Sequence, residues 1–211
     1  MNKIIDIDQV SFAYDSEEVI HNYSLQIEAG SFVCITGESG CGKSTLLRLM
    51  NGLLIPQKGK ISVCDKILSP DNLLATRRMM GYILQDGSLF PHLTVYQNMT
   101  FCMNLQQVSA EKCKARIDEL LPLLNLSPDL LPKFPNELSG GQRQRVGIIR
   151  GIAHKPKIVL MDEPFSSLDP ETRESLQDLV KNIHQKTSTT FVMITHSLSE
   201  AEKLGSMIVR M

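Results

Sequence analysis

Apolar and polar positions alternate near the amino terminus and give way, further along the chain, to short runs that are fully apolar. Ile4 to Ala13 and Tyr23 to Ile27 alternate around a polar stretch at 15–18, which predicts two strands that each have one solvated face. Ser31 to Thr36 contains four consecutive apolar residues and is flanked by glycines, as expected of a strand buried on both faces. Similar runs predict further strands at 60–63, 80–84, 157–161 and 190–194.

Segments with a helical spacing of apolar residues lie between these runs. Ser44 to Asn51 follows such a pattern and stops before Gly52 and Pro56. A loop that contains three prolines separates two longer helical segments in the middle of the chain. Alternating strands and helices predict an α/β fold with a mostly parallel sheet, and the middle helices predict a helical subdomain inserted into that core. The longer helical segments are 109–124, 140–153 and 170–185.

Composition narrows the functional classes. The 211 residues suffice for one large domain, and a formal net charge of -1 gives no overall basic field, so we expect no nucleic-acid partner. The five cysteines are widely spaced and form no paired motif, which indicates a reducing compartment rather than disulfides or a zinc site. The amino terminus has no signal-peptide pattern, and no apolar run reaches the roughly 20 residues that cross a bilayer. Any role at a membrane is therefore expected to depend on a partner.

A glycine-rich loop follows the strand at 31–36 and precedes the helix at 44–51. Its glycines let backbone N–H groups converge on phosphate oxygens, and the helix presents its positive end to the same anion. Lys43 adds charge at the outer phosphates, and the Ser44 hydroxyl is suited to bind Mg²⁺. A chance match is the alternative, and the loop alone does not separate a kinase, a GTPase and a transport ATPase. The predicted nucleotide-binding residues are Gly37, Glu38, Ser39, Gly40, Cys41, Gly42, Lys43, Ser44 and Thr45.

Two adjacent carboxylates, Asp162 and Glu163, end the buried strand that starts near 158. Because side chains alternate along a strand, these neighbours are suited to different tasks: Asp162 to face Mg²⁺, and Glu163 to polarise the attacking water. An ordinary polar strand end before Pro164 is the alternative. The phosphate loop earlier in the chain favours the catalytic interpretation.

The sequence Leu-Ser-Gly-Gly-Gln at 138–142 precedes this strand and completes a set of motifs. Over nearly its whole length, and with the motifs in the same order, the chain resembles the nucleotide-binding subunit of an ATP-binding cassette (ABC) transporter. The resemblance implies a P-loop NTPase core with a mostly parallel sheet, an N-terminal antiparallel β-subdomain and an inserted helical subdomain. It implies ATP and Mg²⁺ as cofactors. Within a single domain, 1–211, the implied parts are 1–86 with 157–211 for the nucleotide-binding core and β-subdomain, and 87–156 for the helical subdomain.

The signature motif works in trans in this family. The resemblance implies that two subunits face each other head to tail, so that Ser139 and Gly141 of one meet the terminal phosphate held by Lys43 of the other. Gly140 and Gln142 belong to the same motif. Small residues at a helix start expose N–H groups and a hydroxyl to an anion. The alternative interpretation is a serine that only caps the helix.

Four further positions match family motifs one at a time. Tyr14 matches the aromatic residue that stacks on adenine, with packing within its strand as the alternative. Gln85 matches the glutamine that approaches Mg²⁺ and the water and links the site to the membrane partner. Asp169 matches the loop that crosses to the other subunit, and it is also suited to cap the helix that begins at Pro170. His196 follows the strand at 190–194 and matches the switch histidine that contacts the terminal phosphate.

These matches divide the predicted site into groups. The implied catalytic residues are Lys43, Gln85, Glu163 and His196. The implied metal ligands are Ser44, Gln85 and Asp162.

The stretch at 89–95 resembles the form found in many small-molecule importers, where it borders the groove for a short permease helix. We therefore expect an ATP-hydrolysing importer subunit that lies in the cytoplasm, peripherally on the inner face of the cell membrane. Its expected partners are a second ATPase subunit, as homodimer or heterodimer, and an integral membrane permease, with an extracytoplasmic binding protein as a further candidate. The cargo is not encoded in these residues.

Three alternatives stay open at this point. An exporter ATPase would share all the motifs. A cassette ATPase without transport is disfavoured, because repair proteins of that kind contain long coiled coils and translation factors contain two cassettes. A phosphoryl-transferring kinase would leave the signature motif and His196 without a task.

The chain departs from the family pattern in two places. Family members usually carry alanines where this chain has Gly147, Ile149 and Gly151, and glycine inside a helix costs about 1 kcal/mol relative to alanine, so we expect a less rigid helix that does not touch the chemistry. Residues 207–211 resemble the start of a strand that continues in relatives. From this we expect no carboxy-terminal regulatory domain.

Overall fold

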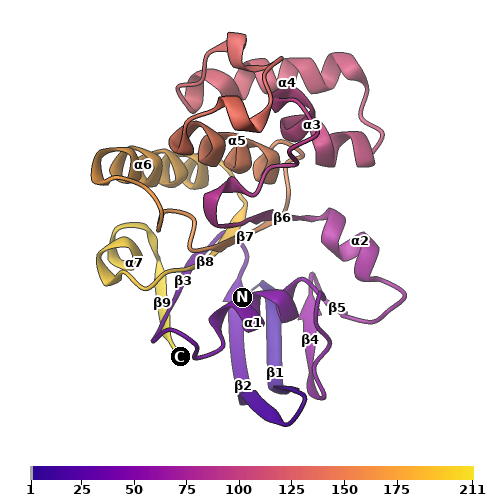
Figure 1. Cartoon of the computed structure of the whole chain (residues 1–211). Helices are drawn as coiled ribbons and strands as arrows, with labels where there is room; N and C mark the ends of the chain where they lie inside the picture. The colour runs from indigo at the N-terminus through magenta and orange to yellow at the C-terminus, as the bar shows by residue number, and fades with distance from the viewer. Residues whose placement is uncertain (1) are drawn as a thin grey trace.

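The computed structural model describes residues 2–211 and contains two sheets (Figure 1). The larger sheet has five parallel strands in the order β6-β7-β8-β3-β9, and each neighbouring pair runs in the same direction. This arrangement confirms the predicted α/β class with a mostly parallel sheet. The strands are β3 (Phe32–Thr36), β6 (Met80–Ile83), β7 (Ile158–Asp162), β8 (Thr190–Ile194) and β9 (Met207–Arg210).

The smaller sheet is antiparallel and is built from the first third of the chain in the order β2-β1-β4-β5. Ile7 of the central strand lies opposite Leu25 on one side and Ile61 on the other. The alternating pattern predicted two of these strands, and the sheet as a whole agrees with the antiparallel β-subdomain implied by the resemblance. Its strands are β1 (Lys3–Tyr14), β2 (Glu17–Glu28), β4 (Lys58–Val63) and β5 (Lys66–Ile67).

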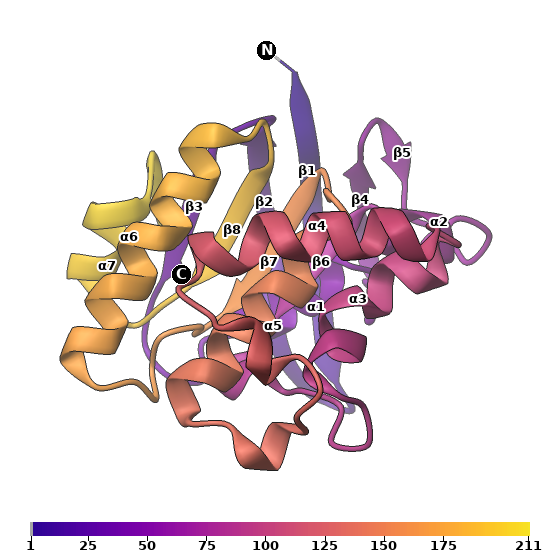
Figure 2. The same ribbon diagram turned by 90° about the horizontal axis from the view of Figure 1, so that it is seen from above.

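Helices cover the parallel sheet, with α5 and α6 on one face and α1 between the two sheets (Figures 1 and 2). The helices are α1 (Lys43–Met50), α2 (Leu73–Arg78), α3 (Val95–Leu105), α4 (Ala110–Leu123), α5 (Gly140–Ile152), α6 (Pro170–Lys186) and α7 (Leu198–Leu204). Short 3₁₀ turns are η1 (Gln85–Gly87), η2 (Pro128–Leu130) and η3 (Pro135–Glu137). Among residues 2–211, none of these helices combines the length and the apolar character needed to span a bilayer.

Alternation along β3 divides the interior into two cores. Phe32 and Cys34 pack in the core under the helices α3 to α6, whereas Val33 and Ile35 pack in the core shared with α1 and the antiparallel sheet. All four side chains are fully buried. Because successive strand residues point to opposite faces, a strand between two cores must be apolar at every position. The continuous apolar run in the sequence has this cause.

Most predicted elements are confirmed, and three helices lie outside the prediction. Helices α2 and α7 have only 6 and 7 residues, too few to show a clear helical period. Helix α3 is longer, and its start carried a readable signal: Thr94 and Gln97 form a reciprocal capping box. The boundaries of the helical subdomain at 87 and 156 stay a prediction.

Glycines allow helix α5 to lie unusually close to β6 and η1. A Cβ atom added to Gly81 would lie 2.0 Å from the carbonyl oxygen of Gly151, and one added to Gly147 would lie 2.7 Å from the Cα of Gly87. Gly147 therefore touches the turn that begins at Gln85. Gly147 and Gly151, where relatives usually carry alanine, lie at close contacts with η1 and β6. The first of these contacts is next to the predicted site residue Gln85, although we expected these positions to lie apart from the chemistry.

We predict that Gly81→Ala destabilises the protein because the new methyl group meets backbone, which cannot rotate away. Forcing an extra carbon into a packed core costs about 1–3 kcal/mol of unfolding free energy. In a chain of this size, a loss of about 2 kcal/mol lowers Tm by roughly 4–8 °C. Thermal unfolding followed by circular dichroism measures this change.

Gly140→Ala is the matched control, because the nearest atom to its added Cβ is a guanidinium nitrogen of Arg143 at 3.8 Å. Its Tm is expected to stay the same or to rise slightly, since alanine favours a helix more than glycine does. Equal melting temperatures for both variants would contradict the close contact of α5 with β6.

Candidate active site

The turn between β3 and α1 has a backbone that only glycine adopts easily. Gly40 and Gly42 have φ angles of 84° and 98°, in the left-handed region. Gly42 immediately precedes α1, and no side chain caps that helix, so its first N–H groups are available to an anion. Within the loop, Glu38, Ser39 and Gly40 are exposed, Gly37, Cys41 and Ser44 are partly buried, and Gly42, Lys43 and Thr45 are buried.

The ammonium group of Lys43 lies inside this loop. Its Nζ donates hydrogen bonds to the carbonyl oxygens of Gly37 at 2.9 Å and Glu38 at 2.6 Å, and it lies 3.7 Å from the Sγ of Cys41. Lys43 is only 6 % exposed, and none of the ion pairs formed within residues 2–211 includes it. A buried cation without a carboxylate partner is suited to receive an anionic ligand.

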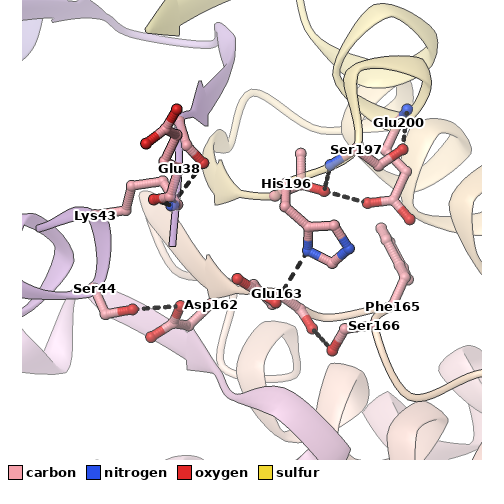
Figure 3. Close-up of polar contacts among 12 residues, drawn as sticks. Glu38, Lys43, Ser44, Asp162, Glu163, Phe165, Ser166, His196, Ser197 and Glu200 are labelled. Atoms are coloured by element: carbon pink, nitrogen blue, oxygen red, sulfur yellow. Dashed lines mark hydrogen bonds and ion pairs between the residues drawn. The ribbon is translucent and has the colours of Figure 1, made fainter. Parts of the chain in front are cut away.

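The hydroxyl of Ser44 meets the first of the two predicted carboxylates. Its Oγ donates to the Oδ1 of Asp162 at 3.0 Å, which joins the start of α1 to the end of β7 (Figure 3). Burial raises the pKa of Asp162, the hydrogen bond from Ser44 lowers it, and the charge of Glu163 raises it, with a net upward shift. The surroundings of Asp162 therefore favour its protonated form, and a cation bound beside it would favour the ionised form.

The second carboxylate, Glu163, leaves the strand at a sharp turn. Strand β7 ends at Asp162, and Glu163 has a φ of 45°, so the two neighbours diverge through a left-handed residue and not only through the strand alternation that the sequence suggested. The backbone N–H of Glu163 donates to the carbonyl of Ile194 at 3.1 Å, and its Oε2 lies 3.3 Å from the Nδ1 of His196. Figure 3 shows the imidazole of His196 turned toward this carboxylate. A strained, non-glycine φ at such a place is typical of a functional site.

Tyr14 and Gln85 lie at the margins of this group. Tyr14 is 40 % exposed, and its hydroxyl lies 3.5 Å from the Oγ1 of Thr45 and 3.5 Å from the Nη1 of Arg48. Gln85 is exposed and opens the turn η1 after β6. Since β6 adjoins β7, Gln85 leaves the sheet next to Asp162. Both positions are compatible with contact to a ligand in the loop.

The signature residues lie on the surface at the start of α5. Ser139 is its N-cap residue: its Oγ accepts from the N–H of Gln142 at 3.3 Å, and the Oε1 of Gln142 accepts from the N–H of Ser139 at 2.9 Å. Ser139 and Gly140 are nevertheless exposed, and Gly141 is partly exposed. Asp169 likewise caps α6 by accepting from the N–H of Thr172 at 3.0 Å, and it is exposed. Ser139 and Asp169 therefore cap their helices and remain exposed, so the capping role leaves room for contact with a second subunit.

Sequence reasoning did not find the residues that tie α5 to the site. Arg150 donates to the carbonyl oxygens of Gly87 at 2.9 Å and Ser88 at 3.0 Å, at the end of the turn that begins at Gln85. The Nε2 of Gln144 donates to the carbonyl of Pro164, directly after Glu163. Both side chains are polar groups buried on an otherwise apolar face of α5. A polar residue within that face is the signal that could have marked them in the sequence.

The oxygen donors of the site fit Mg²⁺ in part. Magnesium prefers oxygen ligands and is commonly held by one or two protein groups together with substrate phosphates. Ser44 Oγ and Asp162 Oδ1 supply such a pair. No cluster of three or more His, Cys, Asp or Glu side chains suited to a metal occurs in the described part of the chain, so phosphate oxygens would have to complete the coordination.

Comparison with known proteins decides the family. A sequence model of the family described as "ABC transporter" matches residues 20–166, more than half of the chain. The chain belongs to the ABC transporter family. As the ABC motifs and the fold agree, it is an ATPase of this family, and ATP hydrolysis for transport is its activity.

Curated ABC relatives resemble it over nearly its full length. The ergothioneine transport ATP-binding protein EgtV of Helicobacter pylori (strain G27) is 50% identical over 206 residues, covering 98% of this chain and 96% of that one. The glycine betaine/carnitine/choline transport ATP-binding protein OpuCA of Bacillus subtilis (strain 168) is 40% identical over 207 residues. The chain spans about half of OpuCA, at 54% of its length.

Solved ABC structures share the fold. The post-hydrolysis dimeric structure of the ATP-binding cassette MJ0796 with ADP and Pi has a TM-score of 0.87 and 32% identity, covering 98% of this chain and 94% of that one. The structure of cbiO1 from Clostridium perfringens, part of the ABC transporter complex cbiONQ, has a TM-score of 0.89 and 25% identity, covering 100% and 85%. The P-loop core, the antiparallel sheet and the helices of this ABC chain therefore have close structural counterparts.

We predict that Asp162→Asn raises the Tm of the nucleotide-free protein at neutral pH. The folded-state pKa of Asp162 lies above its unfolded value of about 3.9, so the folded state binds the proton more tightly and stability falls as pH rises between the two values. Asparagine keeps the bond with Ser44 and carries no charge. Melting curves at pH 7.5 and near pH 3.5 measure the difference, which should be largest at pH 7.5.

Asp71→Asn, at an exposed position, is the matched control and should change Tm little at either pH. In the presence of Mg-ATP the advantage of Asp162→Asn should disappear, because wild type gains a cation beside this carboxylate. A lower Tm for Asp162→Asn than for wild type at pH 7.5 without nucleotide would overturn the assignment of a strained, partly buried charge.

Proposed function

We propose that the chain powers the uptake of a small molecule through a membrane permease, by binding Mg-ATP between two cassettes and hydrolysing it there. One observation carries the proposal. The ammonium of Lys43, the Ser44–Asp162 pair and the Glu163–His196 pair lie at or just after the carboxyl ends of β3, β7 and β8, with Lys43 and Ser44 at the start of α1. An open α/β sheet binds its ligands at that end.

Each side chain has a task in hydrolysis under this proposal. The loop N–H groups and Lys43 hold the β- and γ-phosphates, and Tyr14 stacks on adenine. Ser44 and Asp162, with Gln85 nearby, would hold Mg²⁺, which would supply positive charge against the phosphates. Glu163 polarises the attacking water, and His196 contacts the terminal phosphate while it is oriented by Glu163.

The second half of the site comes from a second cassette, in a homodimer or heterodimer. Ser139 and Asp169 are exposed and Gly141 is partly exposed, and Ser139 and Gly141 stand at the start of α5, where a helix presents N–H groups. Such groups stabilise an anion at the facing loop. The dimeric MJ0796 structure with ADP and Pi supports this arrangement.

The proposed partner is an integral permease, which would hold the chain in the cytoplasm on the inner face of the membrane, with an extracytoplasmic binding protein outside. The relatives EgtV and OpuCA are named for ergothioneine and for glycine betaine, carnitine and choline, which all carry a quaternary ammonium group. We therefore propose a small quaternary ammonium compound as the class of cargo.

Glu163→Gln tests the mechanism. The amide keeps the shape of the side chain but cannot accept a proton, so we expect ATP hydrolysis to fall by about 100-fold or more while ATP still binds. ATP should then hold the variant as a dimer in size-exclusion chromatography with light scattering. In cells, accumulation of labelled glycine betaine, choline or ergothioneine should be lost.

Glu111→Gln, exposed at the start of α4, is the control and should hydrolyse ATP and support uptake like wild type. A Glu163→Gln protein that stays monomeric with ATP would count against the shared site. Lost efflux, with uptake unchanged, would point to an exporter.

A further inference from the structure

A buried carboxylate lies behind the predicted switch histidine. Glu200 of α7 is 8 % exposed and takes part in none of the ion pairs formed within residues 2–211. Its Oε2 accepts a hydrogen bond from the Oγ1 of Thr195 at 2.5 Å, and its Oε1 accepts one from the Nε2 of Gln177 at 3.3 Å. A buried charge is costly unless it is fully hydrogen-bonded, so a carboxylate here calls for a specific task.

The bonds of Glu200 fix the backbone on both sides of His196. The hydroxyl of Thr195 gives its only proton to Glu200, and its lone pair accepts the N–H of Ser197 at 3.1 Å. The N–H of Glu200 in turn donates to the Oγ of Ser197 at 3.3 Å. Figure 3 shows the His196 imidazole pointing toward Glu163, with Ser197 and Glu200 on its other side.

The His196 side chain itself has little support. It is 65 % exposed, and its Nδ1 contact with Glu163 at 3.3 Å is the one hydrogen bond or ion pair of this side chain in the described chain. Its direction therefore depends on the backbone at 195–197. The side chains of Thr195 and Ser197 hold that backbone through bonds to the carboxylate and the N–H of Glu200, in addition to the backbone bonds of Thr195 to Ile35 and of Ser197 to Ala201.

The same carboxylate connects this segment to α6. Gln177 lies in the middle of α6, whose first turn carries Asp169 as its cap. Further contacts join α7 to α6: Lys203 Nζ lies 2.7 Å from Asp178 Oδ1 and 4.0 Å from Glu174 Oε1, and Lys181 Nζ donates to the carbonyl of Lys203 at 2.8 Å. Helix α7 is thus tied to the helix that begins at the predicted subunit interface.

We propose that Glu200 is a positioning residue that orients His196 for hydrolysis and links it to α6. The inference rests on the proposed function, because it assumes that His196 acts on the terminal phosphate. Glu200 itself touches neither nucleotide nor water under this proposal. Loss of its carboxylate should therefore reduce the rate of hydrolysis and leave ATP binding intact.

Glu200→Ala in the full chain is expected to lower kcat by about 10- to 100-fold, as for a misplaced catalytic group, with the Kd for ATP changed less than about 2-fold. Glu200→Gln retains an acceptor oxygen for Thr195 and should recover most of the rate. Thr195→Val removes the hydrogen bond to the Glu200 carboxylate, and also the one that Thr195 accepts from the Ser197 N–H, with little change of shape, so it serves if Glu200→Ala does not fold. ATPase assays and equilibrium nucleotide binding measure these values.

Glu202→Ala is the matched control, since Glu202 lies on the same helix with an exposed side chain, and it should behave like wild type. A double variant separates positioning from general weakening of the fold. If Glu200 acts through His196, His196→Ala with Glu200→Ala should be no slower than His196→Ala alone. A purely structural role would make the two losses multiply.

The outcomes distinguish this inference from the proposed function. If His196→Ala hydrolyses ATP like wild type, the proposed role of His196 is wrong, whatever Glu200 does. If His196→Ala is slow but Glu200→Ala and Thr195→Val keep the wild-type kcat, only the positioning role is overturned. Multiplying losses in the double variant, or a weakened Kd for ATP, overturn it as well.

Discussion

The buried ammonium group of Lys43 is the constraint on which the rest of the site depends. A cation at 6 % exposure needs negative charge or many acceptors, and here two loop carbonyls, of Gly37 and Glu38, satisfy it. A bound phosphate supplies a better partner than neutral carbonyls, because charge-assisted hydrogen bonds are stronger. Under the proposed function, the loop glycines and the start of α1 add donors for the same anion, and Asp162 supplies a metal ligand beside it.

Under the proposed function, one chain supplies only part of the site for a triphosphate. Lys43, Asp162 and Glu163 are buried or partly buried and are fixed by hydrogen bonds within the chain. Ser139 and Asp169 cap α5 and α6 with their side chains, yet both residues are exposed. The Ser139 hydroxyl and the start of α5 place hydrogen-bond donors at the surface, as a site shared between two copies needs. This contrast supports the proposal that the working unit is a dimer.

The sequence predicted most of what local patterns determine. The four consecutive apolar residues of β3 and of β8 alternate between two cores, and the loop before Lys43 follows from glycine chemistry. What it missed depends on contacts between distant segments. Glu163 has a positive φ, and Gln177 donates a hydrogen bond to Glu200. Neither feature can be read from a local pattern in the sequence. Helix α3 was missed although Thr94 signalled its start.

Ser139→Arg in a protein that also carries Glu163→Gln tests the central claim most directly, because ATP binding and dimerisation are then measured in the same samples. If the signature residue acts on the nucleotide of a facing subunit, the isolated protomer should bind ATP with unchanged affinity, and the ATP-dependent dimer should be lost. Ser139 is exposed, so an arginine is tolerated by the monomer. An ATP-dependent dimer that persists, or ATP binding that is lost in the monomer, would contradict a site divided between two chains.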